Sequence, residues 1–306
     1  MILIYSRDAD HFVNEVIDYL EEDYIRIGDL DKMYIEDLNI APNGVIFNIK
    51  GEFFNAIDLN RVKTIWFNGG SANTLGSKYE NDSYSLLVNS FLHKKEVKKI
   101  GRLINSFEVN KLDVQLYARE YGFKTPKTFI TTDKNKLVRF YNKFKNGIIC
   151  KRMTDVLFYK NDEFAYDFTP TFLIDSNTLK KIPDFFAVSL FQERILADFE
   201  VRVVYICGKF YAMAIHTFED NVDYRHELSM GKNVRAVPFE LPTDVKNKIT
   251  KIVKRLKLNY GAIDLMYSGD EFYFLEINPV GQVGFVNTIC NFYIEKELSN
   301  ILKNEA

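Results

Sequence analysis

The sequence from residue 260 to residue 285, YGAIDLMYSGDEFYFLEINPVGQVGF, constrains the fold more than any other part of the chain. Two apolar runs of strand length flank residues 268–270, Ser-Gly-Asp, which favour a tight turn, so we expect a β-hairpin. Polar side chains interrupt these runs at Asp264, Glu276 and Asn278. Such groups cost roughly 2 to 7 kcal/mol each when they are buried without partners. These three residues therefore require a counter-charge or a ligand.

The spacing of the polar residues predicts a metal site. Because alternate side chains of a strand share a face, Glu276 and Asn278 should point into the same space, with Phe272 and Phe274 on that side as well. If the hairpin closes at its turn, Asp264 joins them. Two carboxylates and an amide oxygen suit magnesium rather than zinc, and nucleotide phosphates usually supply its remaining ligands. The alternative is that Glu276 and Asn278 only end the sheet and hold the following turn.

Three basic residues upstream are candidate counter-charges. Lys111 follows Asn110 at the predicted start of a helix, where the dipole disfavours a cation and favours a phosphate. Lys151 ends an apolar strand, and Arg202 lies between apolar neighbours on the same strand face as Glu200. Two alternatives remain open. Lys151 can simply reach solvent, and Arg202 can form a structural ion pair with a neighbouring strand.

Composition excludes several classes of protein. A chain of 306 residues, 47% hydrophobic and 27% charged, predicts a soluble globular protein with two or three packed layers. The formal net charge of -2 provides no overall field that would recruit nucleic acid or an anionic membrane. Neither a G-x-x-x-x-G-K-[ST] loop nor a G-x-G-x-x-G fingerprint occurs, so a nucleotide would not be held in those ways.

Targeting signals are also missing from the sequence. The start, MILIYSRDADHF, turns polar too early for a signal peptide, and no apolar run approaches the ~20 residues of a membrane helix. Cys150, Cys207 and Cys290 lack the paired spacing of a zinc site or a disulfide framework, which suits a reducing compartment. We therefore expect a cytoplasmic protein.

Turn and cap signals divide the chain into elements of an α/β (α+β) fold. We expect a strand at 1–5, a helix capped by Asp10, hairpin strands at 44–49 and 52–57, and a buried strand at 62–67. Further predictions are a helix after Asn110 that ends at Gly122, a hairpin over 158–166, a turn at 208–209 and a helix capped by Thr243. We predict three closely packed units with boundaries near residues 105 and 190.

In their order along the chain, these markers resemble those of the ATP-grasp ligases over nearly the whole sequence. The resemblance implies an N-terminal pre-grasp domain at 1–105, a central ATP-grasp subdomain at 106–190 and a C-terminal subdomain with the metal site at 191–306. The markers are Asn110 and Lys111, Lys151, the segment Gln192, Glu193, Arg194 and Ile195, the pair Glu200 and Arg202, and the set Asp264, Glu276, Asn278 and Pro279.

Two local features narrow the resemblance to the graspetide synthetases of microviridin-type pathways, especially the grasp-with-spasm peptide maturases. Residues 223–225, Asp-Tyr-Arg, are similar to their precursor-contacting Asp-aromatic-Arg motif, and residues 275–285 are similar to the stretch that follows their metal site. The alternative for 223–225 is a solvated loop. The sequence departs from the family after Trp66, where Phe67-Asn68-Gly69-Gly70 stands in place of arginines, so no leader-peptide or phosphate contacts are carried over there.

The resemblance implies roles for the marked residues. Asp264, Glu276 and Asn278 would hold Mg²⁺ against ATP, with Lys111 and Lys151 on the phosphates. The segment 192–195 would bind adenine, Glu200 the ribose, and Arg202 would be catalytic. Substrate contacts fall to Asp223, Arg225 and His216, although a histidine in a strand is more often a core residue.

The implied reaction is ATP-dependent macrocyclisation of a ribosomally synthesised precursor peptide with a leader and a core. An Asp or Glu side chain would become an acyl phosphate and then react with Ser or Thr to give an ester, or with Lys to give an amide. The resemblance also implies a homodimer. Two alternatives stay open: a ligase that adds amino acids to a small molecule or protein tail, and an inactive grasp fold that binds a peptide or nucleotide.

Overall fold

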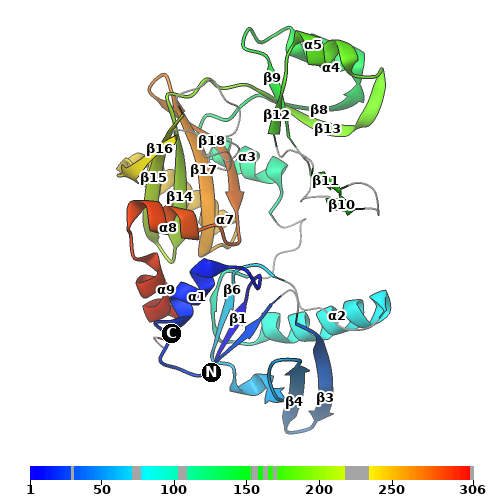
Figure 1. The fold of residues 1–306 in the computed structure, drawn as a ribbon, viewed down its shortest axis with the longest axis vertical. Helices are drawn as coiled ribbons and strands as arrows, with labels where there is room; N and C mark the ends of the chain where they lie inside the picture. Colours follow the sequence, from blue (N-terminus) through cyan, green and yellow to red (C-terminus); the bar gives the residue numbers. More distant parts are fainter. Residues whose placement is uncertain are drawn as a thin grey trace.

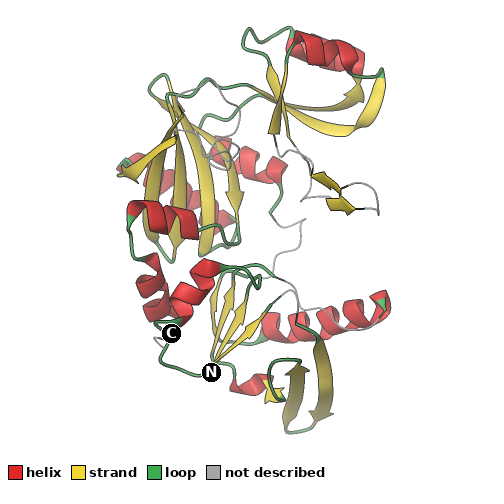
Figure 2. Ribbon diagram, in the orientation of Figure 1, coloured by secondary structure: helices red, strands yellow, loops and turns green. Residues whose placement is uncertain are grey.

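The computed structural model describes residues 1–28, 31–70, 77–102, 109–151, 153, 158–160, 165–167, 171–217 and 234–303. In these residues the larger sheets are a parallel sheet near the N-terminus, a sheet in the middle of the sequence and a five-stranded C-terminal sheet. Figures 1 and 2 show the N-terminal unit at the bottom, the C-terminal sheet above it and the middle sheet at the top. In the described part of the chain, none of the helices combines the length and apolarity needed to cross a membrane.

The N-terminal sheet has the strand order β2-β1-β6-β7, and all its pairings are parallel. Its core strands are fully buried because helix α1 packs on one face and helix α2 on the other. The side chain of Asp10 caps α1 by accepting from the amide of Val13, as predicted. The elements are β1 (Ile2–Tyr5), α1 (His11–Ile17), β2 (Tyr24–Ile27), β6 (Thr64–Phe67), α2 (Lys78–Lys94) and β7 (Lys98–Ile100).

The N-terminal hairpin differs from the prediction. Strand β4 (Gly44–Gly51) pairs mainly with β3 (Met33–Ala41) through the turn at Pro42-Asn43-Gly44, not with the run 52–57. In that run only Ile57 enters a strand, β5 (Ile57–Asp58), which is followed by the 3-10 helix η1 (Leu59–Arg61). The reason is that Phe54 folds back against Gly51 and interrupts the extended chain there.

The middle sheet has the strand order β12-β9-β13-β8, and its pairings are antiparallel. Helices α4 and α5 contribute to a common core with it. A short antiparallel pair, β10 with β11, confirms the predicted hairpin over 158–166. The elements are β8 (Thr128–Asp133), α4 (Lys134–Tyr141), β9 (Ile148–Lys151), β10 (Phe158–Lys160), β11 (Ala165–Asp167), β12 (Thr171–Ile174), α5 (Ser176–Lys181) and β13 (Phe185–Glu193).

The C-terminal sheet, β16-β15-β14-β17-β18, is antiparallel and covered on both faces. Helices α3 and α7 pack on one face, while α1, α8 and α9 share a core with the other. Helix α3 thus packs against β18 and α7, although it precedes the middle sheet in sequence. The elements are α3 (Lys111–Glu120), β14 (Phe199–Ile206), β15 (Lys209–Thr217), β16 (Val234–Phe239), α7 (Thr243–Arg255), β17 (Tyr260–Ser268), β18 (Glu271–Asn278), α8 (Gly284–Cys290) and α9 (Ile294–Lys303).

Two local predictions for this sheet need correction. The turn between β14 and β15 is at Cys207-Gly208, both with positive φ, one residue earlier than predicted. Helix α7 begins at Thr243, but its N-cap is Pro242, which has no side chain able to cap. The predicted turn at Gly269-Asp270 between β17 and β18 is confirmed, with both residues in the left-handed region.

A buried hydrogen-bond chain joins the N-terminal unit to the C-terminal sheet. The Tyr260 hydroxyl donates to Oδ1 of Asn68 at 2.6 Å, and Nδ2 of Asn68 donates to Oδ2 of Asp10 at 2.9 Å. The Trp66 ring meets Tyr260 edge-on. Burial, and then the charge of Asp10, raise the pKa of the Tyr260 hydroxyl, so it stays a donor. These hydrogen bonds fix the loop after β6 relative to β17.

Replacing Tyr260 by Phe should lower the free energy of unfolding by about 1–3 kcal/mol, because Oδ1 of buried Asn68 loses its donor. Urea denaturation measures this loss. The matched control is Tyr267→Phe, which removes an exposed hydrogen bond to Asp270 and should change stability by less than about 0.5 kcal/mol. Equal losses in the two variants would contradict a linking role for Tyr260.

Candidate active site

Three neighbouring strands bring the predicted charged residues into one row. In the strand register Arg202 of β14 lies opposite Asp264 of β17, and Asp264 lies opposite Glu276 of β18. Directly paired residues of antiparallel strands project to the same face, so the three side chains are neighbours. Asn278 lies two residues beyond Glu276 on that face, and Glu200 lies two residues before Arg202. The predicted grouping of Asp264, Glu276 and Asn278 is therefore present in the fold.

A β-bulge changes which side chains of β18 accompany this row. Asp264 pairs with Glu276, but Leu265 pairs with Phe274, so Leu275 is an extra residue. The bulge reverses the alternation, and Phe274 turns into the core beneath α3 and α7. The expectation that Phe272 and Phe274 share the face of Glu276 is wrong for this reason. Beside the bulge, the amide of Phe274 donates to the carbonyl of Lys124, which lies along the sheet edge.

Arg202 and Asp264 form a buried ion pair beneath the site. Nη1 of Arg202 donates to Oδ1 of Asp264 at 2.7 Å, and the two side chains are 1% and 6% exposed. Nη2 donates to Oε1 of Gln282 at 2.9 Å, and the guanidinium lies over the Phe285 ring. The predicted alternative, a structural ion pair between strands, is thus realised with Asp264. The pair also places a guanidinium beside the carboxylates of this row.

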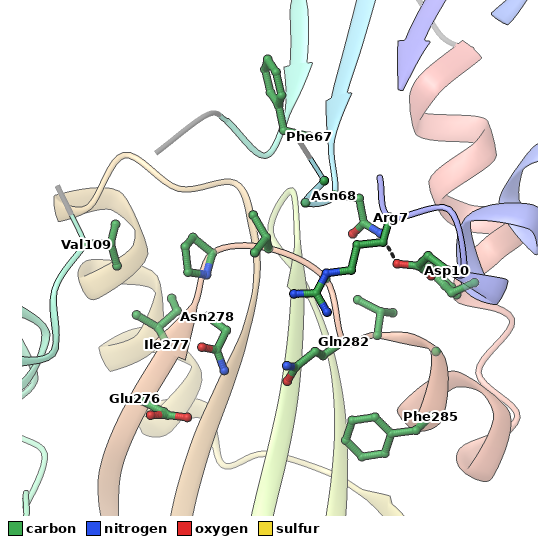
Figure 3. A pocket seen from close by; sticks show the side chains of 18 of the residues that line it. Arg7, Asp10, Phe67, Asn68, Val109, Glu276, Ile277, Asn278, Gln282 and Phe285 are labelled. Atoms are coloured by element: carbon green, nitrogen blue, oxygen red, sulfur yellow. Dashed lines mark hydrogen bonds between the residues drawn. The ribbon is translucent and has the colours of Figure 1, made fainter. Parts of the chain in front are cut away.

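A cavity of about 1270 Å³ opens at the C-terminal end of β18, where Glu276 and Asn278 lie. Its walls come from the loops after β1 and β6, from the start of α3, and from the segment after β18. Figure 3 shows Glu276, Asn278 and Gln282 on one side of it, with Arg7, Asp10 and Asn68 opposite. Of the predicted residues, Lys111, Glu276 and Asn278 line this cavity together.

Lys111 reaches the cavity from the first turn of α3. Asn110 caps the helix, as predicted, by accepting from the amides of Leu112 and Asp113. Leu112 and Leu116 share the exposed face of this helix, whereas Val114, Gln115 and Ala118 are the buried side chains. The helix start therefore presents a lysine and a positive dipole end toward the same space as Glu276, an arrangement that favours an anion.

The predicted adenine segment and Lys151 belong to the middle sheet instead. Lys151 ends β9 opposite Leu190 of β13 and is half-buried. Gln192 is buried, donates from Nε2 to the hydroxyl of Thr128 at 2.9 Å, and its Oε1 has no partner among the described residues. The amide of Glu193 donates to the carbonyl of Lys127 at 2.9 Å. Arg194 and Ile195 follow in the segment that leads to β14.

The structure does not bring His216 to this site. On β15 it follows Ile215, the register partner of Glu200, and its ring lies tilted against the Phe199 ring, with centroids 5.3 Å apart, on the face covered by α3 and α7. Phe199 and Arg202 are three residues apart on the same strand, and because this spacing is odd, Arg202 points to the opposite face. The prediction that His216 contacts substrate is therefore not supported. Asp223 and Arg225 lie outside the described residues.

Oxygen donors are the ligands that Mg²⁺ prefers, and the residues present fit that requirement. Glu276 and Asn278 line the cavity, and Asp264 is the direct neighbour of Glu276. Among the described residues no three His, Cys, Asp or Glu side chains gather as a metal cluster. The candidate donor set thus consists of two carboxylates and one amide.

Gln282 was not singled out from the sequence. It follows Gly281, and both residues have positive φ, 61° and 58°, so the chain turns sharply back toward Arg202. A Gly-Gln pair just after the predicted metal residues was the available signal, but only the fold reveals its contact with β14.

The chain resembles solved structures much more clearly than it resembles known sequences. No protein-family profile and no curated protein sequence matches the chain. The macrocyclase MdnC from Microcystis aeruginosa MRC, bound with precursor peptide MdnA, is 20% identical over 99% of each chain, with a TM-score of 0.82. A RiPP-associated ATP-grasp ligase of Chryseobacterium gregarium, in complex with ADP and a leader and core peptide, is 21% identical over 98% of this chain and 96% of that one, with a TM-score of 0.81.

A more distant likeness points to the same architecture. The D-alanine–D-alanine ligase of Bacillus anthracis complexed with ATP is 13% identical over 99% of this chain and 95% of its own, with a TM-score of 0.57. The chain has the ATP-grasp fold. The predicted fold class is thereby confirmed. Within this ATP-grasp fold, the row Arg202, Asp264 and Glu276 lies on the C-terminal sheet.

Replacing Asp264 by Asn should lower the free energy of unfolding by about 3–5 kcal/mol, because the buried guanidinium of Arg202 loses its charged partner. Chemical denaturation measures the loss. The double variant Arg202→Met with Asp264→Leu removes both charges and should lose less stability than Asp264→Asn alone. A double variant that is less stable than Asp264→Asn would show that the ion pair itself, rather than avoidance of a lone buried charge, holds the strands together.

Proposed function

We propose that this chain is an ATP-dependent peptide ligase that forms macrocycles in a ribosomally synthesised precursor peptide. The observation that carries the proposal is the likeness, over nearly the full length of both chains, to two ligases solved with precursor or leader and core peptides. Their TM-scores, 0.82 and 0.81, exceed the 0.57 of a ligase for a small molecule. The cavity of about 1270 Å³ is large enough for a peptide side chain beside a nucleotide phosphate group.

The charges around the cavity suit the acyl-phosphate reaction that the resemblance implies. A side-chain carboxylate of the peptide attacks the γ-phosphorus of ATP, the bond from that phosphorus to the ADP oxygen breaks, and an acyl phosphate forms. A hydroxyl or amine of the same peptide then attacks the acyl carbon, loses its proton and releases phosphate. Lys111 and the start of α3 counter the charge of the nucleotide, and Lys151 would do so from the middle sheet.

The C-terminal sheet holds the remaining groups. Glu276, Asn278 and Asp264 would bind Mg²⁺, which when bound offsets the charge of the phosphate oxygens. Arg202 pairs with Asp264 directly beneath this set, where its positive charge would stabilise negative charge that develops on the transferred group. Glu200, on the same face, would contact the ribose.

The adenine is assigned to Gln192 and Glu193 at the end of β13 and to Arg194 and Ile195 in the segment that leads to β14. The buried Oε1 of Gln192 supports this assignment, because it is an acceptor that a donor from a bound base would satisfy. Asp223 and Arg225 are proposed to bind the acidic side chain of the peptide, with Arg225 as a bidentate partner. The three cysteines are free, which fits action in the cytoplasm, where precursor peptides are made.

Glu276→Gln should reduce peptide-dependent ADP release by roughly 100-fold or more, because it removes a metal ligand. The fold should stay intact, since the side chain is only half-buried. ADP release and peptide mass, which falls by one water per linkage, measure the effect with a candidate precursor encoded near the gene. The matched control is Glu271→Gln on the same strand, whose carboxylate makes an exposed ion pair with Lys124. Unchanged turnover in Glu276→Gln would remove Glu276 from the metal site.

The alternative activity makes a different prediction in the same assay. A ligase that adds free amino acids would release ADP with an amino-acid mixture and would not need the peptide. ADP release with free amino acids alone would therefore replace the macrocyclase proposal. ATP binding without release in either assay would leave a binding protein.

We also propose that the enzyme is a homodimer, and exposed apolar side chains of the N-terminal unit support this. Ile40 and Ile46 of the β3–β4 hairpin are 77% and 51% exposed, and Leu86 of α2 is 71% exposed. Light scattering coupled to size exclusion should give twice the chain mass of 35.8 kDa. The double variant Ile40→Lys, Ile46→Lys should have the mass of a monomer. A monomeric mass for the wild type would contradict the proposal.

A further inference from the structure

The wall of the cavity contributed by the N-terminal unit carries an arginine that has no role so far. Arg7 follows β1 and lines the cavity. Figure 3 shows its guanidinium extending into the cavity toward Asn278 and Gln282. Among the described residues, the hydrogen bonds of Arg7 involve its backbone carbonyl, and its guanidinium makes no hydrogen bond or ion pair. A cation in this position can bind an anion in the cavity without first breaking an internal contact.

A second arginine fixes the backbone that carries Arg7. Arg26 donates from Nη2 to the carbonyls of Arg7 and Asp8, at 2.5 and 3.1 Å, and from Nε to the hydroxyl of Ser6 at 2.6 Å. Its Nη1 donates to Oδ1 of Asn14 on α1 at 2.5 Å. Four hydrogen bonds from one planar group hold this loop in a single conformation. The backbone from which the Arg7 side chain extends is therefore held at the edge of the cavity.

Close backbone contact joins this loop to the next one. A Cβ atom at Gly70 would lie 2.2 Å from the carbonyl oxygen of Ser6, and Gly70 has a φ of +76°, so glycine is required there. The two loops follow β1 and β6, adjacent parallel strands. The carboxyl ends of parallel strands are where open α/β sheets bind ligands. The hydrogen bonds of Asn68 to Tyr260 and Asp10 fix these loops against β17.

The position of Arg7 separates it from the proposed nucleotide residues. Lys151 and Gln192 lie on the middle sheet, and Lys111 lies at the start of α3. Arg7 comes from the N-terminal unit, which Figure 1 shows at the opposite end of the molecule from the middle sheet, and it faces Asn278 and Gln282 in the cavity. An anion bound by Arg7 would therefore meet the metal ligands from the side away from adenine. In the proposed reaction, the anion that approaches from that side is the attacking carboxylate.

We propose that Arg7 binds the substrate carboxylate that ATP activates, from the N-terminal wall and in addition to the contact proposed for Arg225, and orients its oxygen toward the γ-phosphorus. The inference rests on the proposed function, which it deepens by naming a substrate contact in the N-terminal unit. A guanidinium matches a carboxylate with two parallel hydrogen bonds, which orients the attacking oxygen as well as attracting it. Arg7 transfers no proton. Its charge balances the carboxylate before attack and the acyl phosphate afterwards.

The experiment uses a pair of probes that differ only in charge: N-acetyl-glutamate N-methylamide and the corresponding glutamine amide. Their dissociation constants are measured by NMR titration of the full chain with Mg²⁺ and a nonhydrolysable ATP analogue. Wild type should prefer the acid by roughly 10-fold or more. Arg7→Met should lose most of that preference, and Arg7→Lys should keep more of it than Arg7→Met. The matched control, Arg61→Met, changes an exposed arginine of the same unit outside the cavity and should behave as wild type.

Other outcomes overturn the proposal. Wild type without an acid preference, or Arg7→Met with an unchanged preference, would show that Arg7 does not bind the carboxylate. Weaker binding of the ATP analogue in Arg7→Met, by the same factor as the acid, would assign Arg7 to the nucleotide phosphates. All three variants change exposed side chains, so folding should be preserved, and urea denaturation confirms it.

The test also separates this inference from the proposed function. The wild type could bind the acid through Arg7 and yet release no ADP with any acidic peptide. That result would support the anion site and contradict the proposed ligase activity. Peptide-dependent ADP release with an unchanged peptide KM in Arg7→Met would keep the activity and remove Arg7.

Discussion

The buried ion pair between Arg202 and Asp264 is the interaction on which the candidate site depends. It joins the central strands β14 and β17 at the level where Glu276 enters from β18. A guanidinium in a core is costly unless a carboxylate accompanies it, so each member of the pair requires the other. Gln282 completes the arrangement by accepting from the same guanidinium. The fold thus couples strand pairing to the charge of the site.

The N-terminal unit completes the cavity, and a few polar contacts hold it there. Tyr260, Asn68 and Asp10 connect β17 to the start of α1, while Asn259 bonds to the backbone of Lys99 and Gly101. An apolar core formed by α1, α8, α9 and the C-terminal sheet supports the same junction. Because the cavity walls come from both sides of this junction, its shape depends on contacts that are far apart in sequence.

Much of the site could be predicted from sequence because its signals are local. Glu276 and Asn278 stand two residues apart in a strand, a tight turn brings Asp264 opposite them, and Asn110 caps the helix that carries Lys111. The period of two and the cap preferences are properties of short segments. The ATP-grasp fold could also be expected, because its markers occur in a fixed order along the chain.

Other features depend on tertiary structure and could not be read in this way. The bulge at Leu275 leaves no mark in the alternation, and His216 lies on the wrong face only because β15 pairs with β14 in one particular register. Packing of α3 against β18 is set by the return of the chain after the middle sheet. Arg7 stands in a polar loop whose meaning appears only when β1 and β6 lie side by side.

The bulge has one further consequence, for strand slippage. β18 is an edge strand, and an edge strand that moves by one residue exchanges its two faces. Such a slip would turn Glu276 into the apolar core and expose Phe274. The extra residue at Leu275 and the hydrogen bond from Phe274 to the Lys124 carbonyl fit only one alignment. The irregularity of β18 therefore keeps a carboxylate facing the cavity at the least constrained position of the sheet.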